Sequence, residues 1–151
     1  MPGVKLFSLQ KWHGVEQLRE LSERLPITEL PDAETFADTA AVMTLLDLII
    51  TADTSVAHLA GALGVPVWVA LAKIADWRWL FDREDTPWYP TMRLFRQETL
   101  GDWKILFNRM AAELDKHVNR SGNDETSTTF KSRILQANGE QAEILSAGEL
   151  R

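Results

Sequence analysis

The sequence of 151 residues contains no cysteine, which excludes both a disulfide framework and thiolate metal sites. It also lacks a long apolar run. The longest apolar stretches, residues 45–50 and 65–72, are far shorter than the roughly 20 residues that a membrane-spanning helix needs. The first residues lack the basic region and apolar core of a secretory signal. We therefore expect a cytoplasmic protein without a transmembrane segment.

Basic residues are in the minority, because 16 Lys and Arg stand against 22 Asp and Glu and give a formal net charge of −6. Such a charge repels nucleic-acid phosphates and anionic membranes. The content of 45% hydrophobic and 25% charged residues is typical of a globular domain, and the chain is long enough to bury a core without cross-links. We expect one domain that does not bind nucleic acid.

Several sequence motifs of cofactor and nucleophile chemistry are also missing. The sequence has no GxGxxG fingerprint, no Walker sequence and no serine nucleophile elbow. The three histidines, His13, His58 and His117, are scattered and have no carboxylates at metal-ligand spacing. We therefore expect neither a metal nor a bound cofactor.

The hydrophobic pattern predicts strands that alternate with helices. The expected strands cover residues 4–9, 27–30, 47–52, 67–71 and 92–96, and the expected helices cover residues 15–25, 39–46, 56–63, 76–81 and 102–118. Pro26 ends the first helix, Asp38 is the expected cap of the second, and Gly64 follows the third. The alternation predicts an α/β fold, a Rossmann-like, doubly wound parallel sheet with right-handed crossovers.

The composition changes after residue 118. Residues 119–129 are polar and rich in turn formers, and Phe130 is the last aromatic residue. We expect a domain over residues 1–118 and a flexible, disordered tail over residues 119–151. The pairs Ile134–Leu135 and Ile144–Leu145 could support a short helix in that tail.

Ligands of a parallel sheet bind beyond the carboxyl ends of its strands, and residues 53–64 (DTSVAHLAGALG) follow such an end. At the start of the expected helix, the backbone N–H groups of Thr54, Ser55 and Val56 favour an anion. Asp53 is a candidate N-cap, a role compatible with function. His58 lies one turn further on, where it either contacts the ligand or is an ordinary structural histidine.

Two further segments carry candidate ligand contacts. Gln10 and Lys11 leave the first strand at the same edge, where Lys11 either meets a diphosphate from the opposite side or is a solvated surface lysine. The segments 76–79 (DWRW) and 87–90 (PWYP) hold three tryptophans and the only tyrosine. They could stack on a base or sugar or meet a partner domain, although we expect Trp77 and Trp79 to pack in the core.

The ordered set of these motifs resembles the nucleotide-sugar-binding half of family 9 glycosyltransferases, the heptosyltransferases and their relatives fused to tetratricopeptide repeats. The main resemblance is residues 47–68 (DLIITADTSVAHLAGALGVPVW). It extends to residues 7–11 (FSLQK), 36–41 (FADTAA), 76–79 (DWRW) and 93–97 (RLFRQ), and so covers roughly residues 3–116.

The resemblance implies a half-domain of the GT-B fold that binds the donor diphosphate for inverting transfer without a metal. It implies that Thr54 and Ser55 donate to the diphosphate, that His58 lies beside them and that Lys11 neutralises the leaving group. Gln10 and Asp53 belong to the same implied substrate-binding set, and Asp38 and Thr39 would lie near the nucleoside. Since Ser55 stands where heptosyltransferases usually have Gly, no particular sugar is implied.

Two functions follow as hypotheses. In the first, the chain binds a nucleoside diphosphate sugar but is incomplete for catalysis, because the family's acceptor site and general base lie in an amino-terminal half that this sequence lacks. In the second, it is a non-catalytic interaction module that forms a homodimer or docks with the missing half or a tetratricopeptide-repeat protein.

Overall fold

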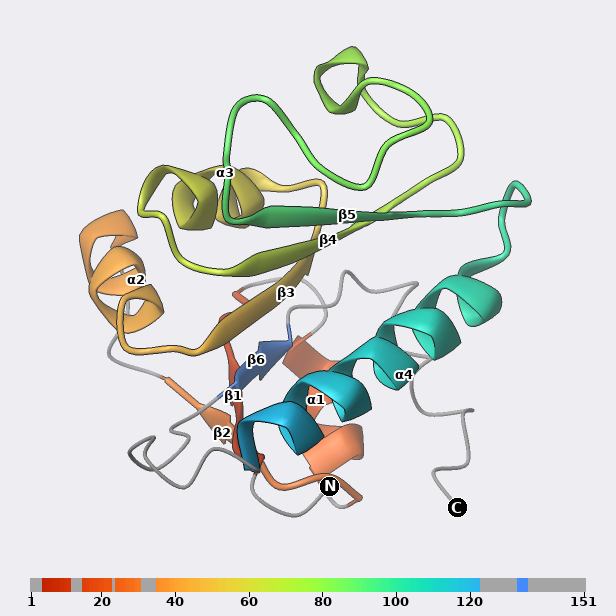
Figure 1. Ribbon diagram of the computed structural model, residues 1–151. Coiled ribbons are helices and arrows are strands. Elements are labelled where there is room, and N and C mark those ends of the chain that lie inside the picture. The colour runs from red at the N-terminus through yellow and green to blue at the C-terminus, as the bar shows by residue number, and fades with distance from the viewer. Residues whose placement is uncertain (1–3, 12–14, 23, 31–34, 123–132, 136–151) are drawn as a thin grey trace.

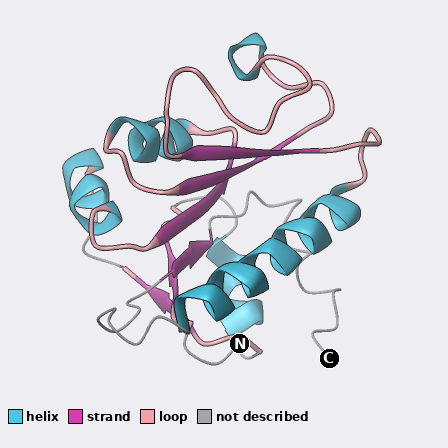
Figure 2. Ribbon diagram, in the orientation of Figure 1, coloured by secondary structure: helices cyan, strands magenta, loops and turns pink. Residues whose placement is uncertain are grey.

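A computed structural model describes residues 4–11, 15–22, 24–30, 35–122 and 133–135, in which strands and helices alternate (Figures 1 and 2). The strands are β1 Leu6–Ser8, β2 Ile27–Glu29, β3 Leu48–Ala52, β4 Val67–Leu71, β5 Met92–Arg96 and β6 Arg133–Leu135. The helices are α1 Val15–Ser22, α2 Phe36–Met43, α3 Ser55–Ala62, the 3₁₀ turn η1 Trp77–Trp79 and α4 Trp103–Gly122. Within the described residues, no helix is both long and apolar enough to cross a bilayer.

The strands form one sheet in the order β2-β1-β6-β3-β4-β5, with every neighbouring pair parallel. From β1 the chain moves outward to β2, then crosses to β3 and continues outward in the other direction through β4 to β5. The direction of the strand order thus changes between β1 and β3, and β6 occupies the position between them. The predicted doubly wound α/β fold is confirmed.

Helices cover both faces of the sheet (Figure 2). Side chains along a strand point alternately to the two faces of a sheet. Because both faces are covered, all residues of β3 and β4 are buried. On one face, Ile49, Val67 and Val69 pack with Met43 of α2 and Ala57 of α3. On the other face, the buried side chains of the sheet and of α4 form a second core: Leu48, Ile50, Trp68, Ala70, Phe95, Leu106, Phe107 and Met110.

Two segments of the predicted tail contribute to this fold. Residues 119–122 continue α4 beyond the expected boundary at residue 118. Ile134 and Leu135 belong to the strand β6 between β1 and β3, so the expectation of a helix at this pair is wrong. The two open edges of β1 and β3 offer backbone hydrogen-bond partners, whereas an isolated short helix is only marginally stable. The remaining residues of the predicted tail, 123–132 and 136–151, lie outside the described residues.

The start of α2 differs from the prediction. Its N-cap is Thr35, whose hydroxyl accepts a hydrogen bond from the backbone N–H of Asp38 at 3.2 Å. The carboxylate of Asp38 in turn accepts from the backbone N–H of Thr35 at 2.8 Å. This reciprocal pair is a capping box, which needs Thr at the cap and an acid three residues later. Asp38 is therefore in the first turn and is not the cap.

Helix α3 lies in close contact with the segment that follows β4, which runs over it in Figure 1. Gly61 is buried against the ring of Tyr89. A Cβ atom added to Gly61 would lie 2.4 Å from Cγ and 2.7 Å from Cδ1 of Tyr89. Only glycine allows this approach of the helix to the ring.

Gly61→Ala should therefore lower the free energy of unfolding by about 2 kcal/mol, the cost typical of an overpacked core. Alanine has a higher helix propensity than glycine, so a loss of stability in Gly61→Ala would have to come from the contact with Tyr89. Chemical denaturation measures the effect. The double variant Gly61→Ala/Tyr89→Ala should lose less than the sum of the two single losses, and additive losses would contradict the contact.

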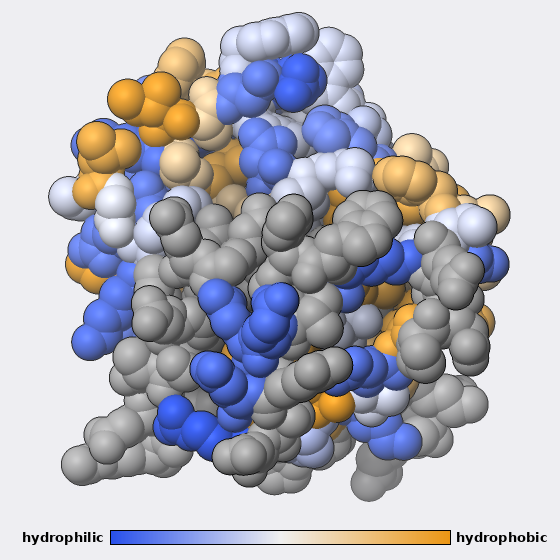
Figure 3. Space-filling model, turned by 180° about the vertical axis from the view of Figure 1, so that it is seen from behind, coloured by the Kyte–Doolittle hydropathy of each residue, from blue (hydrophilic) through white to orange (hydrophobic). Residues whose placement is uncertain are grey.

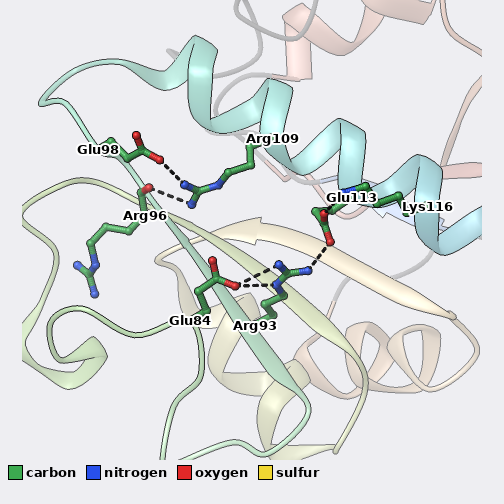
Figure 4. Close-up of polar contacts among 7 residues, drawn as sticks. All are labelled: Glu84, Arg93, Arg96, Glu98, Arg109, Glu113 and Lys116. Atoms are coloured by element: carbon green, nitrogen blue, oxygen red, sulfur yellow. Dashed lines mark hydrogen bonds and ion pairs between the residues drawn. The ribbon is translucent and has the colours of Figure 1, made fainter.

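Arg93 of β5 joins three parts of the chain (Figure 4). Its guanidinium pairs with Glu113 of α4 at 2.8 Å and with Glu84 of the preceding loop at 3.1 Å. The same group lies 4.7 Å above the ring of Phe95. Hydrogen bonds from Lys116 and from Arg93 lower the pKa of Glu113 from 4.5 to about 2. The charged form of Glu113 is thus favoured in the folded protein.

A carboxyl with a lowered pKa stabilises the fold above its unfolded pKa, and this contribution is lost as the pH falls through its folded pKa. For Glu113 the loss should occur between pH 4.5 and about pH 2. Urea denaturation across this range should show a steeper loss of stability for the natural protein than for Glu113→Gln. Asp115→Asn, which removes an exposed carboxyl of the same helix, should keep the steeper loss. Parallel curves for the natural protein and Glu113→Gln would contradict the assignment.

Candidate functional site

The candidate site lies at the carboxyl edge of the sheet, where the strand order changes direction. Crevices for ligands form at this position in doubly wound sheets. Phe7 of β1 and Ile49 of β3 both pair with Ile134 of β6, so the two residues are level. Lys11 and Asp53 each follow four residues later. The loops after β1 and β3 therefore leave the sheet side by side, roughly 10 Å apart, the width of two strand spacings.

The loop after β1 is held by a short turn. The hydroxyl of buried Ser8 accepts a hydrogen bond from the backbone N–H of Gln10 at 3.1 Å, and Leu9 is buried in the core. These contacts place the half-buried Gln10 and Lys11 at the edge of the sheet. The ammonium group of a lysine at this edge would meet an anion as a point charge.

The loop after β3 leads into α3, and its N-cap is Thr54, not Asp53. Thr54 has the extended conformation of a cap, with φ −139° and ψ 171°, and its carbonyl accepts from the N–H of Ala57 at 3.0 Å. The predicted cap role of Asp53 is therefore wrong, and Asp53 is exposed one residue earlier. The hydroxyl of Thr54 lies 3.2 Å from that of Thr51, which is buried in β3.

The N-termini of α2 and α3 differ in whether side chains cap their backbone N–H groups. The first turn of α2 is satisfied by its own side chains, since Thr35 and Asp38 form the capping box and the hydroxyl of Thr39 donates to the carbonyl of Thr35 at 2.9 Å. At α3, Thr54 makes no side-chain capping bond, and the first turn has no acidic residue. Among the residues that the structure describes, the N–H groups at the start of α3 thus have no local side-chain acceptor of the kind that α2 supplies for itself.

His58 is held by residues far along the chain. Its Nδ1 lies 3.1 Å from the hydroxyl of Tyr89, and its ring stacks on Trp79 at 5.2 Å between centroids. Trp79 is fully buried, which confirms its predicted core position, whereas Trp77 is 69% exposed, so the core prediction for Trp77 is wrong. The structure brings His58 to the same helix turn as Ser55 but also gives it these packing contacts.

Of the residues predicted for the site, the loops after β1 and β3 therefore bring five to the same edge: Gln10, Lys11, Asp53, Thr54 and Ser55. Asp38 and Thr39 use their polar groups within α2, and their contact with a nucleoside stays a prediction. Thr51 is not among the predicted site residues, and Tyr89 is included only as part of the candidate segment 87–90 (PWYP). The position of Thr51 near the end of the apolar run that leads into the loop could have indicated it, but no local pattern links Tyr89 with a histidine 31 residues away.

The contacts of His58 predict a measurable structural role. Tyr89→Phe keeps the ring and removes one hydrogen bond, so it should lower the free energy of unfolding by about 1 kcal/mol. His58→Ala also removes the stacked ring and should cost more than Tyr89→Phe. Thermal and urea denaturation of both variants test this order. A His58→Ala variant as stable as the natural protein would show that His58 contributes nothing to the fold.

Comparison with known proteins gives two matches. The model of glycosyltransferase family 9 (heptosyltransferase) matches residues 2–71, which include both loops of the candidate site. Protein FlbA from Caulobacter vibrioides is 32% identical over 119 residues, which are 75% of this chain and 20% of FlbA. The chain thus spans only 20% of the length of this relative. No solved structure matches the chain.

Proposed function

Because residues 2–71 match the model of glycosyltransferase family 9 (heptosyltransferase), we propose that this chain is the nucleotide-sugar-binding half of a glycosyltransferase. The donor diphosphate binds between Lys11 and the start of α3. One observation carries the proposal: the uncapped start of α3 lies across from Lys11 at the change of strand direction.

Each residue has a defined role in this proposal. The N–H groups of Ser55 and Val56 donate to phosphate oxygens, and the positive end of the helix dipole favours their charge. Lys11 pairs with the diphosphate from the β1 side. When the bond between sugar and diphosphate breaks, negative charge grows on the departing oxygen, and the same groups stabilise it. A site of this kind needs no metal.

We propose further that the chain binds the donor without completing the transfer. Displacement at the anomeric carbon requires a bound acceptor and a base placed within hydrogen-bonding distance of its hydroxyl. The resemblance implies that both come from another half of the fold, and the match to 20% of FlbA is in keeping with a longer functional protein.

The second candidate function is an interaction module. Trp77, Phe81 and Trp88 of the segment after β4 are 69%, 70% and 56% exposed, which is unusual for large aromatic side chains. The view from behind shows apolar surface in separate patches among hydrophilic residues, above the part drawn in grey (Figure 3). These aromatic residues could dock another chain, including a second copy, in a protein that binds no nucleotide.

Calorimetric titration with UDP-, ADP- and GDP-sugars tests the first function. Ser55→Pro should weaken binding about tenfold, because it removes an N–H that donates to a charged ligand. Proline fits the first position of a helix, and the extended Thr54 before it has the conformation that precedes proline. Lys11→Met, which removes the charge but keeps an apolar stem, should weaken binding to a similar extent.

Ser55→Ala is the matched control, because it keeps the N–H and removes only the hydroxyl, and it should bind nearly as well as the natural protein. Unchanged affinity in Ser55→Pro, with the fold intact, would exclude that N–H as a contact. No heat with any of the nucleotide sugars, together with a dimer that depends on concentration in sedimentation, would favour the interaction module.

A further inference from the structure

A hollow lies beyond the ends of β4 and β5, outside the segment that matches family 9. Its volume is about 660 Å³, and it is open to solvent. The side chains that matter for its chemistry are Lys73, Phe81, Arg96, Gln97 and Arg109, and we call it the β5 hollow. The end of β5, the loop after β4 and one side of α4 form the β5 hollow.

The β5 hollow holds buried hydrogen-bond donors without acceptors. Among the described residues, four side-chain nitrogens that border it are buried and have no partner: Nε and Nη1 of Arg96, Nε2 of Gln97 and Nε of Arg109. Gln97 is only 3% exposed, and its carbonyl oxygen accepts from the N–H groups of Lys73 and Gly101 at 3.2 Å each. The amide nitrogen therefore keeps its donors for another group. Buried donors without acceptors are costly, and a bound acceptor removes the cost.

The charges around the β5 hollow also favour an anion. Arg96 donates to the carbonyls of Trp79 and Leu80 at 3.3 and 2.6 Å, and the ammonium of Lys73 donates to the carbonyl of Glu98 at 2.8 Å. Within the described part of the chain, neither positive charge pairs with a carboxylate. The carboxylate of Glu98 is bound by Arg109 at 2.8 Å.

The other charged residues that line the β5 hollow do not cancel this excess. Arg83 pairs with Asp85 at 2.6 Å, and Glu84 is bound by Arg93 at 3.1 Å. Asp82 is the remaining acid of the lining, and it is exposed. The lining thus offers one exposed carboxylate, that of Asp82, to balance the two positive charges of Arg96 and Lys73.

Phe81 lies over the guanidinium of Arg96. Its ring centroid lies 6.0 Å from Cζ of Arg96, while its side chain is 70% exposed. Leu80 and Asp82, on either side, both have φ of 52°, which is uncommon for residues other than glycine. Strained loop residues of this kind gather at ligand sites. Because the Phe81 side chain is largely exposed, a rotation of its ring would uncover Arg96 at little cost to the core.

We propose that the β5 hollow binds an oxyanion, the phosphate or carboxylate group of a small ligand, through Arg96, Gln97 and Lys73. In Figure 4 the Arg96 side chain leaves β5 on the side away from Arg109, so the two guanidiniums border the hollow from different directions. The site is separate from the start of α3 and does not depend on the proposed donor binding.

Nitrogen-resolved NMR on the whole chain tests the proposal, because it observes the Nε–H of Arg96 and the side-chain amide of Gln97 directly. Titration with inorganic phosphate should give saturable shifts of both signals, beyond those caused by sodium chloride at equal ionic strength. Succinate in a second titration reports on carboxylates. Shifts with phosphate alone assign a phosphate ester, and shifts with both anions assign a general oxyanion site.

Arg96→Gln and Lys73→Gln should each weaken phosphate binding about tenfold, the loss expected for a charge-assisted hydrogen bond. Lys73 is exposed, so Lys73→Gln keeps the fold even where Arg96→Gln loosens the loop that Arg96 holds. Arg78→Gln, an arginine outside the lining, is the control and should bind as the natural protein does. Ser55→Pro should leave these shifts unchanged, which separates this site from the donor site.

The absence of saturable shifts in the natural protein would show that only water fills the hollow and would overturn the proposal. Equal affinity in Lys73→Gln, Arg78→Gln and the natural protein would overturn it as well, because the shifts would then come from a general effect of phosphate on the chain.

Discussion

The position of α3 between the sheet and the segment that follows β4 is the constraint on which the rest of the structure depends. Gly61 lets the ring of Tyr89 approach the helix, and His58 joins the same ring and Trp79 from the next turn. Ala57 and Ala60, on an adjoining side of the helix, are buried in the core with residues of β3 and β4. A helix fixed by both sets of contacts presents its first turn at one place beyond β3. The geometry of the candidate donor site is therefore set by core packing some distance from it.

The same fold uses helix starts in two ways. At α2 the sequence supplies its own acceptors, and the side chains of Thr35 and Asp38 close the start of the helix. At α3 the hydroxyl of Thr54 turns to Thr51, and the helix start stays open beside the loop of Lys11. The β5 hollow extends this contrast, because Arg96 and Gln97 again keep donors that the chain does not satisfy. Both proposals thus depend on hydrogen-bond donors without acceptors at the carboxyl edge of the sheet, although different residues supply these donors.

The elements with strong periodicity could be predicted from the sequence, and the polar details could not. The bounds of β4 and β5 match the prediction, because each is a short segment rich in apolar residues that turn residues bound on both sides. The caps at Asp38 and Asp53 were wrong, since several nearby Asp and Thr residues compete and the backbone conformation decides. The contact of His58 with Tyr89 and the open donors of Arg96 depend on residues brought together only by folding. Strand β6 is too short, in too polar a segment, for any pattern to indicate it.

The place of β6 affects the order in which the molecule can be completed. Strands β3, β4 and β5 are neighbours in both sequence and space, so they can pair as soon as they leave the ribosome. Among the described strands, β1 and β2 reach them through backbone hydrogen bonds only by way of β6, which is the last to be synthesised. The pairing of β1 with β6 therefore cannot form until β6 has been synthesised. Such long-range pairing is slow to form, and until it forms the open edges of β1 and β3 are exposed to other chains.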